Sequence, residues 1–342
     1  MINKLYHYFS EKAFIYRFTV IASVFRFNKQ MQSRRIDKQH ISYRHYLHTF
    51  CLVRCTLSEY MDYELFLKTD EEIRTYLTMY NKHRILSLLG DRHAALTITG
   101  CKHGFNKKYA SFLGREWIAV SFCTQEEFLQ FIKKHKQVIF KRPDAFQGNG
   151  IERFVYTDDN TALNKYELLK KENALVEEVL VQHEKIAAFN PQTVNTLRVS
   201  TLCINGHVHL IGACFKTGNG NSSVDNLVKG GVGCGMDADT GCIITDGFDH
   251  DLNTVINHPV SGCTFKNFRI PNWQAVKETV QKAAVFCEQN GDGHFIGWDV
   301  AVTPDGAAII EGNWNQGLTL IQNRQSGKAA VIESVLKEEG IL

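Results

Sequence analysis

The order of apolar and polar positions divides the chain into a helical first part and a longer part in which strands and helices alternate. Up to about residue 90 the pattern is helix-like and almost free of Gly and Pro, as in SEYMDYELFLKTDEEIRTYLTMYNKHRILSLLG, which ends at Gly90. From AALTITG onward, short apolar runs typical of strands alternate with amphipathic helical stretches. This pattern predicts α/β or α+β construction after a helical N-terminal region.

Several elements of the second part can be placed from caps and turn residues. Thr124 is the expected N-cap of a helix in TQEEFLQFIKKH, which precedes the strand QVIFKRP. A glycine-containing loop, a strand, a helix and the strand ALVEEVLV come next. After Pro191 strands dominate, as in TVNTLRVSTLCI and HVHLIGACFKTG, and we expect one helix from Trp273 to about Gln289 and a last one in KAAVIESVLKEEG.

The hairpin GWDVAVTPDGAAIIEGNWNQG carries polar side chains at positions that otherwise read as buried strand. Its centre, TPDGA, suits a three-residue loop in which Gly306 adopts the left-handed conformation. Pairing Thr303 with Ala307 then places Asp299 opposite Glu311. The sequence therefore predicts two carboxylates that face each other across the hairpin.

These two carboxylates need a positive partner, because like charges on directly opposed strand positions destabilise a sheet. Alternation along the strand puts Asn313 on the same face as Glu311. Oxygen donors of this kind suit Mg²⁺ or Mn²⁺, with the phosphates of a nucleotide completing the coordination. We expect Asp299, Glu311 and Asn313 to be metal ligands. A solvent-facing hairpin whose acids keep the sheet soluble is the alternative.

Upstream residues have the chemistry to hold a nucleotide. Lys141 ends an apolar strand, where its ammonium can reach a phosphate, and the following loop contributes Gln147, Gly148 and Gly150, whose backbone amides can bind phosphate oxygens. A glycine pair of this kind is also common in simple turns.

The strand ALVEEVLV and the residues after it suit an adenosine. An adenine can pair with backbone groups where this strand ends, and Glu184 can accept the ribose hydroxyls, although the acids here also fit a solvated edge. Arg198 lies in the middle of an apolar strand, and a buried arginine requires an anionic partner such as a transferring phosphoryl group. The expected adenosine-binding residues are Glu177, Glu178, Val179, Leu180 and Glu184.

Charge is unevenly distributed along the 342 residues. The chain has a net charge of +3, yet residues 1–54 contain ten Lys or Arg and two acids, a net of +8, which leaves −5 for the remainder. This basic, aromatic segment predicts either an amphipathic helix on the inner membrane surface or a solvated helical face that packs on the protein. We expect no nucleic-acid partner, because no nucleic-acid motif accompanies the charge.

The remaining composition favours a cytoplasmic protein. The ten cysteines are scattered singly, without zinc-type spacing, which indicates reduced thiols. Apolar runs are too short for a membrane span, and no signal-peptide cleavage site follows the first of them.

The motifs together resemble the ATP-grasp superfamily, and in particular the sugar-transfer-associated ATP-grasp branch, over about residues 100–335. The resemblance is carried by FKRP with QGNG, VEEVL, NTLRV, KTGNGNSSVDNLVKGGVG and GWDVAVTPDGAAIIEGN. It implies an α+β fold with two lobes that clasp ATP and Mg²⁺, preceded by the helical region. Lys141 and Lys107, or its neighbour Lys108, are then phosphate-binding residues, Arg198 stabilises the transferred phosphate, and Lys216 lies near the acceptor or a phosphate.

The same resemblance implies a reaction. We expect an ATP- and Mg²⁺-dependent ligase that joins a carboxylate to an amine through an acyl phosphate, with small-molecule or glycan-linked substrates in surface polysaccharide assembly. A kinase-like phosphotransferase and a non-catalytic nucleotide-binding protein are the alternatives. The expected division is a helical region over residues 1–90, an N-terminal and central lobe over 91–180, and a C-terminal lobe with the metal site over 181–342.

Overall fold

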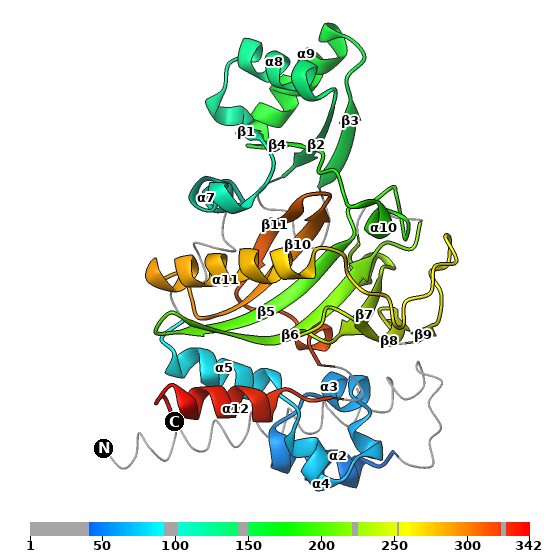
Figure 1. Cartoon of the computed structure of the whole chain (residues 1–342), viewed down its shortest axis with the longest axis vertical. Helices are drawn as coiled ribbons and strands as arrows, with labels where there is room; N and C mark the ends of the chain where they lie inside the picture. Colours follow the sequence, from blue (N-terminus) through cyan, green and yellow to red (C-terminus); the bar gives the residue numbers. More distant parts are fainter. Residues whose placement is uncertain (1–40, 92–101, 143–149, 221–224, 252, 323–325) are drawn as a thin grey trace, which may run out of the picture. The chain divides into compact units, whose positions relative to one another are not determined.

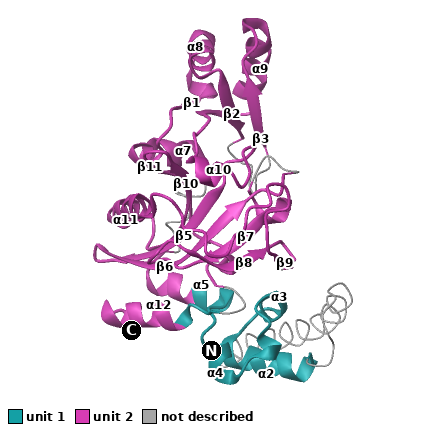
Figure 2. Cartoon of the chain, turned by 45° about the vertical axis from the view of Figure 1, so that its right-hand side comes forward, with its two compact units in different colours: residues 1–83, 323–329 teal, residues 84–322, 330–342 magenta. Residues whose placement is uncertain are grey.

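The computed structural model describes residues 41–91, 102–142, 150–220, 225–251, 253–322 and 326–342 (Figure 1). The expectations for the first 40 residues, and those for Gln147 and Gly148, lie outside these ranges. The chain forms two compact units: residues 1–83 with 323–329, and residues 84–322 with 330–342 (Figure 2). No helix in the described ranges is long and apolar enough to cross a bilayer.

The first unit is helical, as the sequence pattern predicts. Two of its helices begin with a capping box, in which the Thr hydroxyl and the Glu carboxylate three residues later bond reciprocally to backbone N–H groups: Thr56 with Glu59, and Thr69 with Glu72. Buried tyrosines form much of the core. Its elements are α2 (Tyr43–Val53), α3 (Leu57–Asp62), η2 (Leu65–Leu67), α4 (Asp70–Arg74) and the first residues of α5 (Met79–Leu88).

A four-stranded antiparallel sheet forms the first part of the second unit, with strand order β1-β4-β2-β3. The helices α8 and α9 pack together beside it and bury a core that includes Phe128, Val138 and Val176 (Figure 1). Thr124 caps α8 in a capping box with Glu127, which confirms the predicted cap. The elements are β1 (Trp117–Ala119), α8 (Gln125–His135), β2 (Gln137–Lys141), β3 (Ile151–Val155), α9 (Asp159–Lys171) and β4 (Leu175–Glu178).

A seven-stranded antiparallel sheet carries the rest of the unit, with strand order β11-β10-β5-β6-β7-β8-β9. The predicted helix from Trp273 to Gln289 is α11, which crosses one face of this sheet and buries its apolar side there (Figure 1). The strands are β5 (Thr196–Ile204), β6 (His207–Thr217), β7 (Val232–Met236), β8 (Ile243–Phe248), β9 (Thr254–Val255), β10 (Phe295–Thr303) and β11 (Gly306–Asn313). Shorter elements are α7 (Lys102–Lys108), η3 (Ala110–Phe112), η4 (Val120–Phe122), α10 (Glu184–Ala187), η5 (Leu227–Lys229), η6 (Leu318–Leu320) and the terminal α12 (Ala329–Glu338).

The hairpin β10–β11 pairs Asp299 with Glu311, as predicted, but reaches this register by a different route. Thr303 pairs with Gly306 rather than with Ala307, so the connection has two residues, and Gly306 does not have a positive φ. The predicted three-residue loop is therefore wrong. A β-bulge after Asp299 adds one residue on β11 and restores the pairing of the two acids.

Candidate active site

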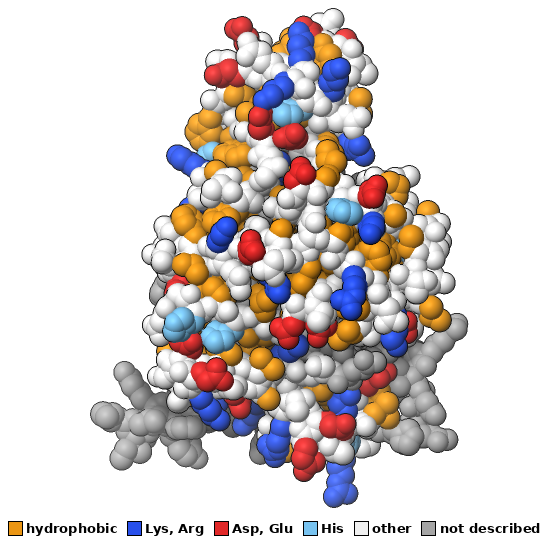
Figure 3. Space-filling model, viewed as in Figure 1, with side chains coloured by type: hydrophobic (Ala, Val, Ile, Leu, Met, Phe, Trp, Pro, Cys, Tyr) orange, Lys and Arg blue, Asp and Glu red, His pale blue; other side chains and the backbone are white. Residues whose placement is uncertain are grey.

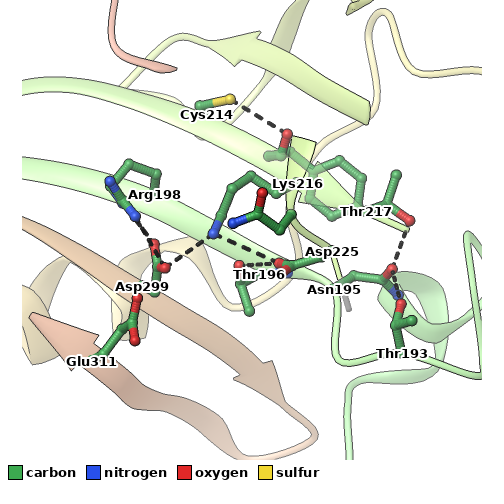
Figure 4. A network of polar contacts seen from close by, with 12 residues as sticks. Thr193, Asn195, Thr196, Arg198, Cys214, Lys216, Thr217, Asp225, Asp299 and Glu311 are labelled. Atoms are coloured by element: carbon green, nitrogen blue, oxygen red, sulfur yellow. Dashed lines mark hydrogen bonds and ion pairs between the residues drawn. The ribbon is translucent and has the colours of Figure 1, made fainter. Parts of the chain in front are cut away.

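The centre of the large sheet holds a buried ion-pair cluster around Asp299 (Figure 4). Arg198 of β5 lies opposite Asp299 of β10, and its Nε donates to Oδ1 at 2.6 Å while a terminal nitrogen donates to Oδ2 at 3.0 Å. Lys216 of β6 donates to the same Oδ2 at 3.0 Å. Arg198, predicted to stabilise the transferred phosphate, and Lys216, predicted to lie near the acceptor or a phosphate, therefore both bond to Asp299, a predicted metal ligand.

The two facing carboxylates have opposite electrostatic environments. Burial opposes ionisation of Asp299, but Arg198 and Lys216 outweigh it and hold the pKa of that carboxyl well below its usual range. Burial raises the pKa of Glu311, and the charge of Asp299 raises it further. The amide of Asn313 donates to Glu311 Oε1 at 3.3 Å. Asp299 is thus firmly ionised, and Glu311 is the acid that still favours an added cation.

The donor set at this hairpin fits a hard divalent cation only in part. Glu311, Asn313 and Asp299 supply oxygens, as Mg²⁺ requires. Among the described residues, however, no group of three or more His, Cys, Asp or Glu side chains is placed to hold a metal ion. A cation bound here would need oxygens from elsewhere, and nucleotide phosphates are the usual source for Mg²⁺.

A second buried cluster surrounds Glu177, one of the predicted adenosine-binding residues. Lys141 Nζ and Arg115 Nε each donate to Glu177 Oε2 at 2.6 Å, and Asn106 donates to Oε1 at 2.9 Å. Burial alone would raise the pKa of Glu177, but the two cations hold it well below its usual range. Arg115 also donates to the backbone carbonyl of Ile309 at 2.8 Å, so it connects the small sheet to β11.

A cavity of about 380 Å³ lies beside the Glu177 cluster, a size within the usual range of small-molecule sites. Its wall brings together five of the predicted nucleotide-binding residues from the central strands and the segment after them: Lys141, Glu177, Glu178, Val179 and Leu180. Apolar residues of β2 and β3 face them. The wall also contains Arg115, Thr196 and Asp225.

Asp225 connects this cavity to the Asp299 cluster. It lines the cavity, accepts hydrogen bonds from the backbone N–H (3.2 Å) and the hydroxyl of Thr196, and lies 3.8 Å from Lys216 Nζ. Burial raises its pKa. Lys216 therefore lies between two carboxylates, Asp225 on the cavity side and Asp299 on the side of the β10–β11 hairpin (Figure 4).

Three other described residues that are predicted to bind the nucleotide do not line this cavity. Glu184 is exposed at the start of α10, and Gly150 is exposed with a φ of +67°. Lys107 is exposed on α7 beside a different hollow, and its neighbour Lys108 forms an ion pair with Asp292 at 2.7 Å. Their nucleotide roles stay predictions.

Sequence reasoning missed Arg115 altogether. The residue sits in a short polar stretch between Gly114 and Glu116, where no apolar strand or glycine loop marks it. Its importance is shown only by the contacts of its side chain in the folded chain. Their partners are Glu177, which lies 62 positions later in the sequence, and Ile309, which lies 194 positions later. To find Arg115, one would have had to know that Glu177, which is distant in the sequence, is its partner in a buried ion pair.

Two antiparallel sheets with helices packed on them, and a cavity beside a buried lysine–carboxylate cluster, define an α+β protein with a candidate active site. The chain matches the sugar-transfer associated ATP-grasp family over residues 73–336, and it belongs to that family. The fold is accordingly ATP-grasp, preceded by a helical N-terminal region. No curated protein sequence matches the chain.

Solved structures of ATP-grasp ligases are similar to the chain at low identity. The ligase PsnB, complexed with a phosphomimetic variant of its minimal precursor, Mg and ADP, is 12% identical with a TM-score of 0.42, over 73% of this chain and 60% of that one. D-alanyl-alanine synthetase A of Vibrio cholerae is 12% identical with a TM-score of 0.40, over 70% and 60%. D-alanine–D-alanine ligase of Bacillus anthracis is 13% identical with a TM-score of 0.41, over 76% of each chain. The chain spans about 60% of the length of the first two.

Proposed function

We propose that this protein is an ATP-dependent carboxylate–amine ligase. The observation that carries the proposal is the buried Arg198–Asp299–Lys216 cluster, which Asp225 joins to a cavity of nucleotide size. Phosphoryl transfer to a carboxylate needs positive charge near the transferred group, since the transition state carries negative charge on several oxygens, and Arg198 and Lys216 can supply it. Membership in the ATP-grasp family supports the same assignment.

In the proposed reaction, a substrate carboxylate oxygen attacks the γ-phosphorus of ATP, and the bond from that phosphorus to ADP breaks. The acyl phosphate then reacts with an amine, so that an amide forms and phosphate leaves. Arg198 and Lys216 stabilise the developing charge, and Lys141 orients the phosphates. When bound, Mg²⁺ supplies Lewis-acid stabilisation of the phosphate oxygens, and Asp299, Glu311 and Asn313 would hold it.

We propose that the substrates belong to surface polysaccharide or glycan assembly, as sugar-linked or small carboxylates and amines. The proposed location is cytoplasmic. Contact of the basic segment over residues 1–54 with the inner membrane surface is part of this proposal, because its net charge of +8 favours anionic lipids.

A screen of substrate pairs tests the function. Uronic acids, amino sugars and amino acids would be combined pairwise with ATP and Mg²⁺, and ADP release would be measured together with product mass. A ligase releases ADP and phosphate and yields an amide only when both a carboxylate and an amine are present. A stable phosphoester formed with one acceptor would show a phosphotransferase instead.

A further inference from the structure

A second hollow, of about 620 Å³, lies beside β1, which is one of the two edge strands of the small sheet. It is lined by side chains from α7, β1, η4 and α8, and none of them lines the cavity that contains Lys141. Hydrophobic side chains reach the surface in this region, between α8 and α7 (Figure 3). The hollow is therefore distinct from that cavity, although its lining includes Lys107, for which a nucleotide role is predicted.

Three aromatic rings form one wall of this hollow. The imidazole of His103 stacks on Phe122, with ring centres 5.1 Å apart and planes at 22°, and meets Trp117 edge-on at 5.5 Å. Phe122 is 79% exposed. Exposure of a phenyl ring is unfavourable, because the ring forgoes the free energy that burial would provide. An aromatic ring that is stacked in place and left in solvent offers a flat face to a ligand.

Polar groups of both kinds border the same hollow. Lys107 is exposed in the last turn of α7, and in the described part of the chain its ammonium forms no hydrogen bond or ion pair. Glu127 is held by the capping box, because the backbone N–H and the hydroxyl of Thr124 both donate to its Oε2. Its Oε1 accepts no bond from the described residues. The hollow thus has an exposed ammonium and an oriented carboxylate beside its aromatic face.

We propose that this hollow binds a pyranose ring of a glycan. The C–H face of a pyranose packs on aromatic rings, and its hydroxyls both donate and accept, which matches Glu127 and Lys107. A simple anion would leave the aromatic wall unused, and a purely apolar ligand would cover the Lys107 ammonium and the Glu127 carboxylate without bonding to them. A nucleobase could also pack on the aromatic wall, but the family's association with sugar transfer favours a sugar.

Indole NMR of the full-length protein, without nucleotide, tests this site directly. The chain has four tryptophans, and the Trp117 signal is assigned as the one that Trp117→Phe removes. Methyl β-glucopyranoside and glucuronate are the probes, each titrated separately. We expect at least one of them to shift the Trp117 signal with saturation, while the other three signals stay in place.

Variants of the lining residues sharpen the test. Phe122→Ala is expected to weaken binding about fivefold or more, the loss of roughly 1 kcal/mol of aromatic contact. Phe122→Leu keeps apolar bulk but removes the ring face, and it is expected to weaken binding to a similar extent. The control is Leu168→Ala, at an exposed position of α9, which is expected to have no effect on binding.

The proposal is overturned if neither probe moves the Trp117 signal, or if Phe122→Ala and Lys107→Gln bind the probe as tightly as the wild type. It is also overturned if Lys107→Gln weakens nucleotide binding and leaves sugar binding unchanged, since Lys107 then serves the phosphates. Because the readout uses no ATP, its failure leaves the ligase proposal standing, and failure of the ligase proposal leaves this one standing.

Discussion

Arg198 and Asp299 lie opposite each other on adjacent strands and form two hydrogen bonds, of 2.6 and 3.0 Å, in the buried centre of the large sheet. Lys216 completes the neutralisation of the same carboxylate at 3.0 Å. A divalent cation that takes Asp299 as a ligand must therefore compete with two side-chain cations. The phosphates of a bound nucleotide would relieve this competition, because they would attract Arg198 and Lys216 away from Asp299 and add oxygens.

The first prediction concerns metal binding without turnover. Mn²⁺ binding, followed by electron paramagnetic resonance, is expected to strengthen about tenfold or more when ADP is present. Lys216→Met is expected to strengthen Mn²⁺ binding without ADP, since one competitor is lost. Equal Mn²⁺ affinity of the wild type with and without ADP would contradict the proposed competition.

The two facing acids are expected to behave differently when neutralised. Asp299→Asn removes the carboxylate that pairs with buried Arg198 and leaves Lys216 with Asp225 alone, so the free energy of unfolding in urea is expected to fall by about 3–5 kcal/mol. Glu311→Gln removes a like charge beside Asp299 and is expected to leave stability unchanged or slightly higher, while ADP release is lost. A comparable loss of stability in both variants would contradict the opposite electrostatic environments inferred for Asp299 and Glu311.

In the Glu177 cluster, we expect Lys141 to contribute mainly to nucleotide binding and Arg115 mainly to stability. Lys141→Met is expected to weaken ADP binding at least about tenfold with little loss of stability, because Glu177 keeps Arg115 and Asn106. Arg115→Met removes bonds to Glu177 and to β11, and is expected to lower the free energy of unfolding by about 3 kcal/mol. Thermal unfolding with and without ADP separates the two effects. If Lys141→Met lowered the melting temperature strongly and Arg115→Met did not, Lys141 rather than Arg115 would be the residue that stabilises the fold.

Stability is expected to depend on pH through His294. Its Nδ1 lies 2.7 Å from buried Asp91, and this hydrogen bond raises the pKa of His294 above its usual 6.5. Since the folded pKa is the higher one, the stabilisation is fully present below the unfolded pKa and is lost as pH rises through the folded value. Urea unfolding of His294→Gln is expected to show a smaller decline above about pH 6.5 than the wild type. His250→Gln, at an exposed position, is the control and is expected to match the wild type.

Local sequence patterns were sufficient for features set by neighbouring residues. The Thr124 cap and the helix from Trp273 to Gln289 follow from hydrogen bonds and apolar spacing within a few positions. The pairing of Asp299 with Glu311 was predicted correctly, although the turn was not. A bulge is stabilised by the packing of its strand, which alternation alone does not encode.

Local motifs were enough to indicate the family, the α+β class, the helical N-terminal region and the facing acids, because each depends on residues that are close together along the chain. Which cation pairs with which carboxylate could be seen only in the folded chain. Arg198 and Asp299 are 101 positions apart, and Arg115 and Glu177 are 62 apart. Such pairs form because burial makes an unpaired charge costly, and the partner is whichever opposite charge the strand order brings near.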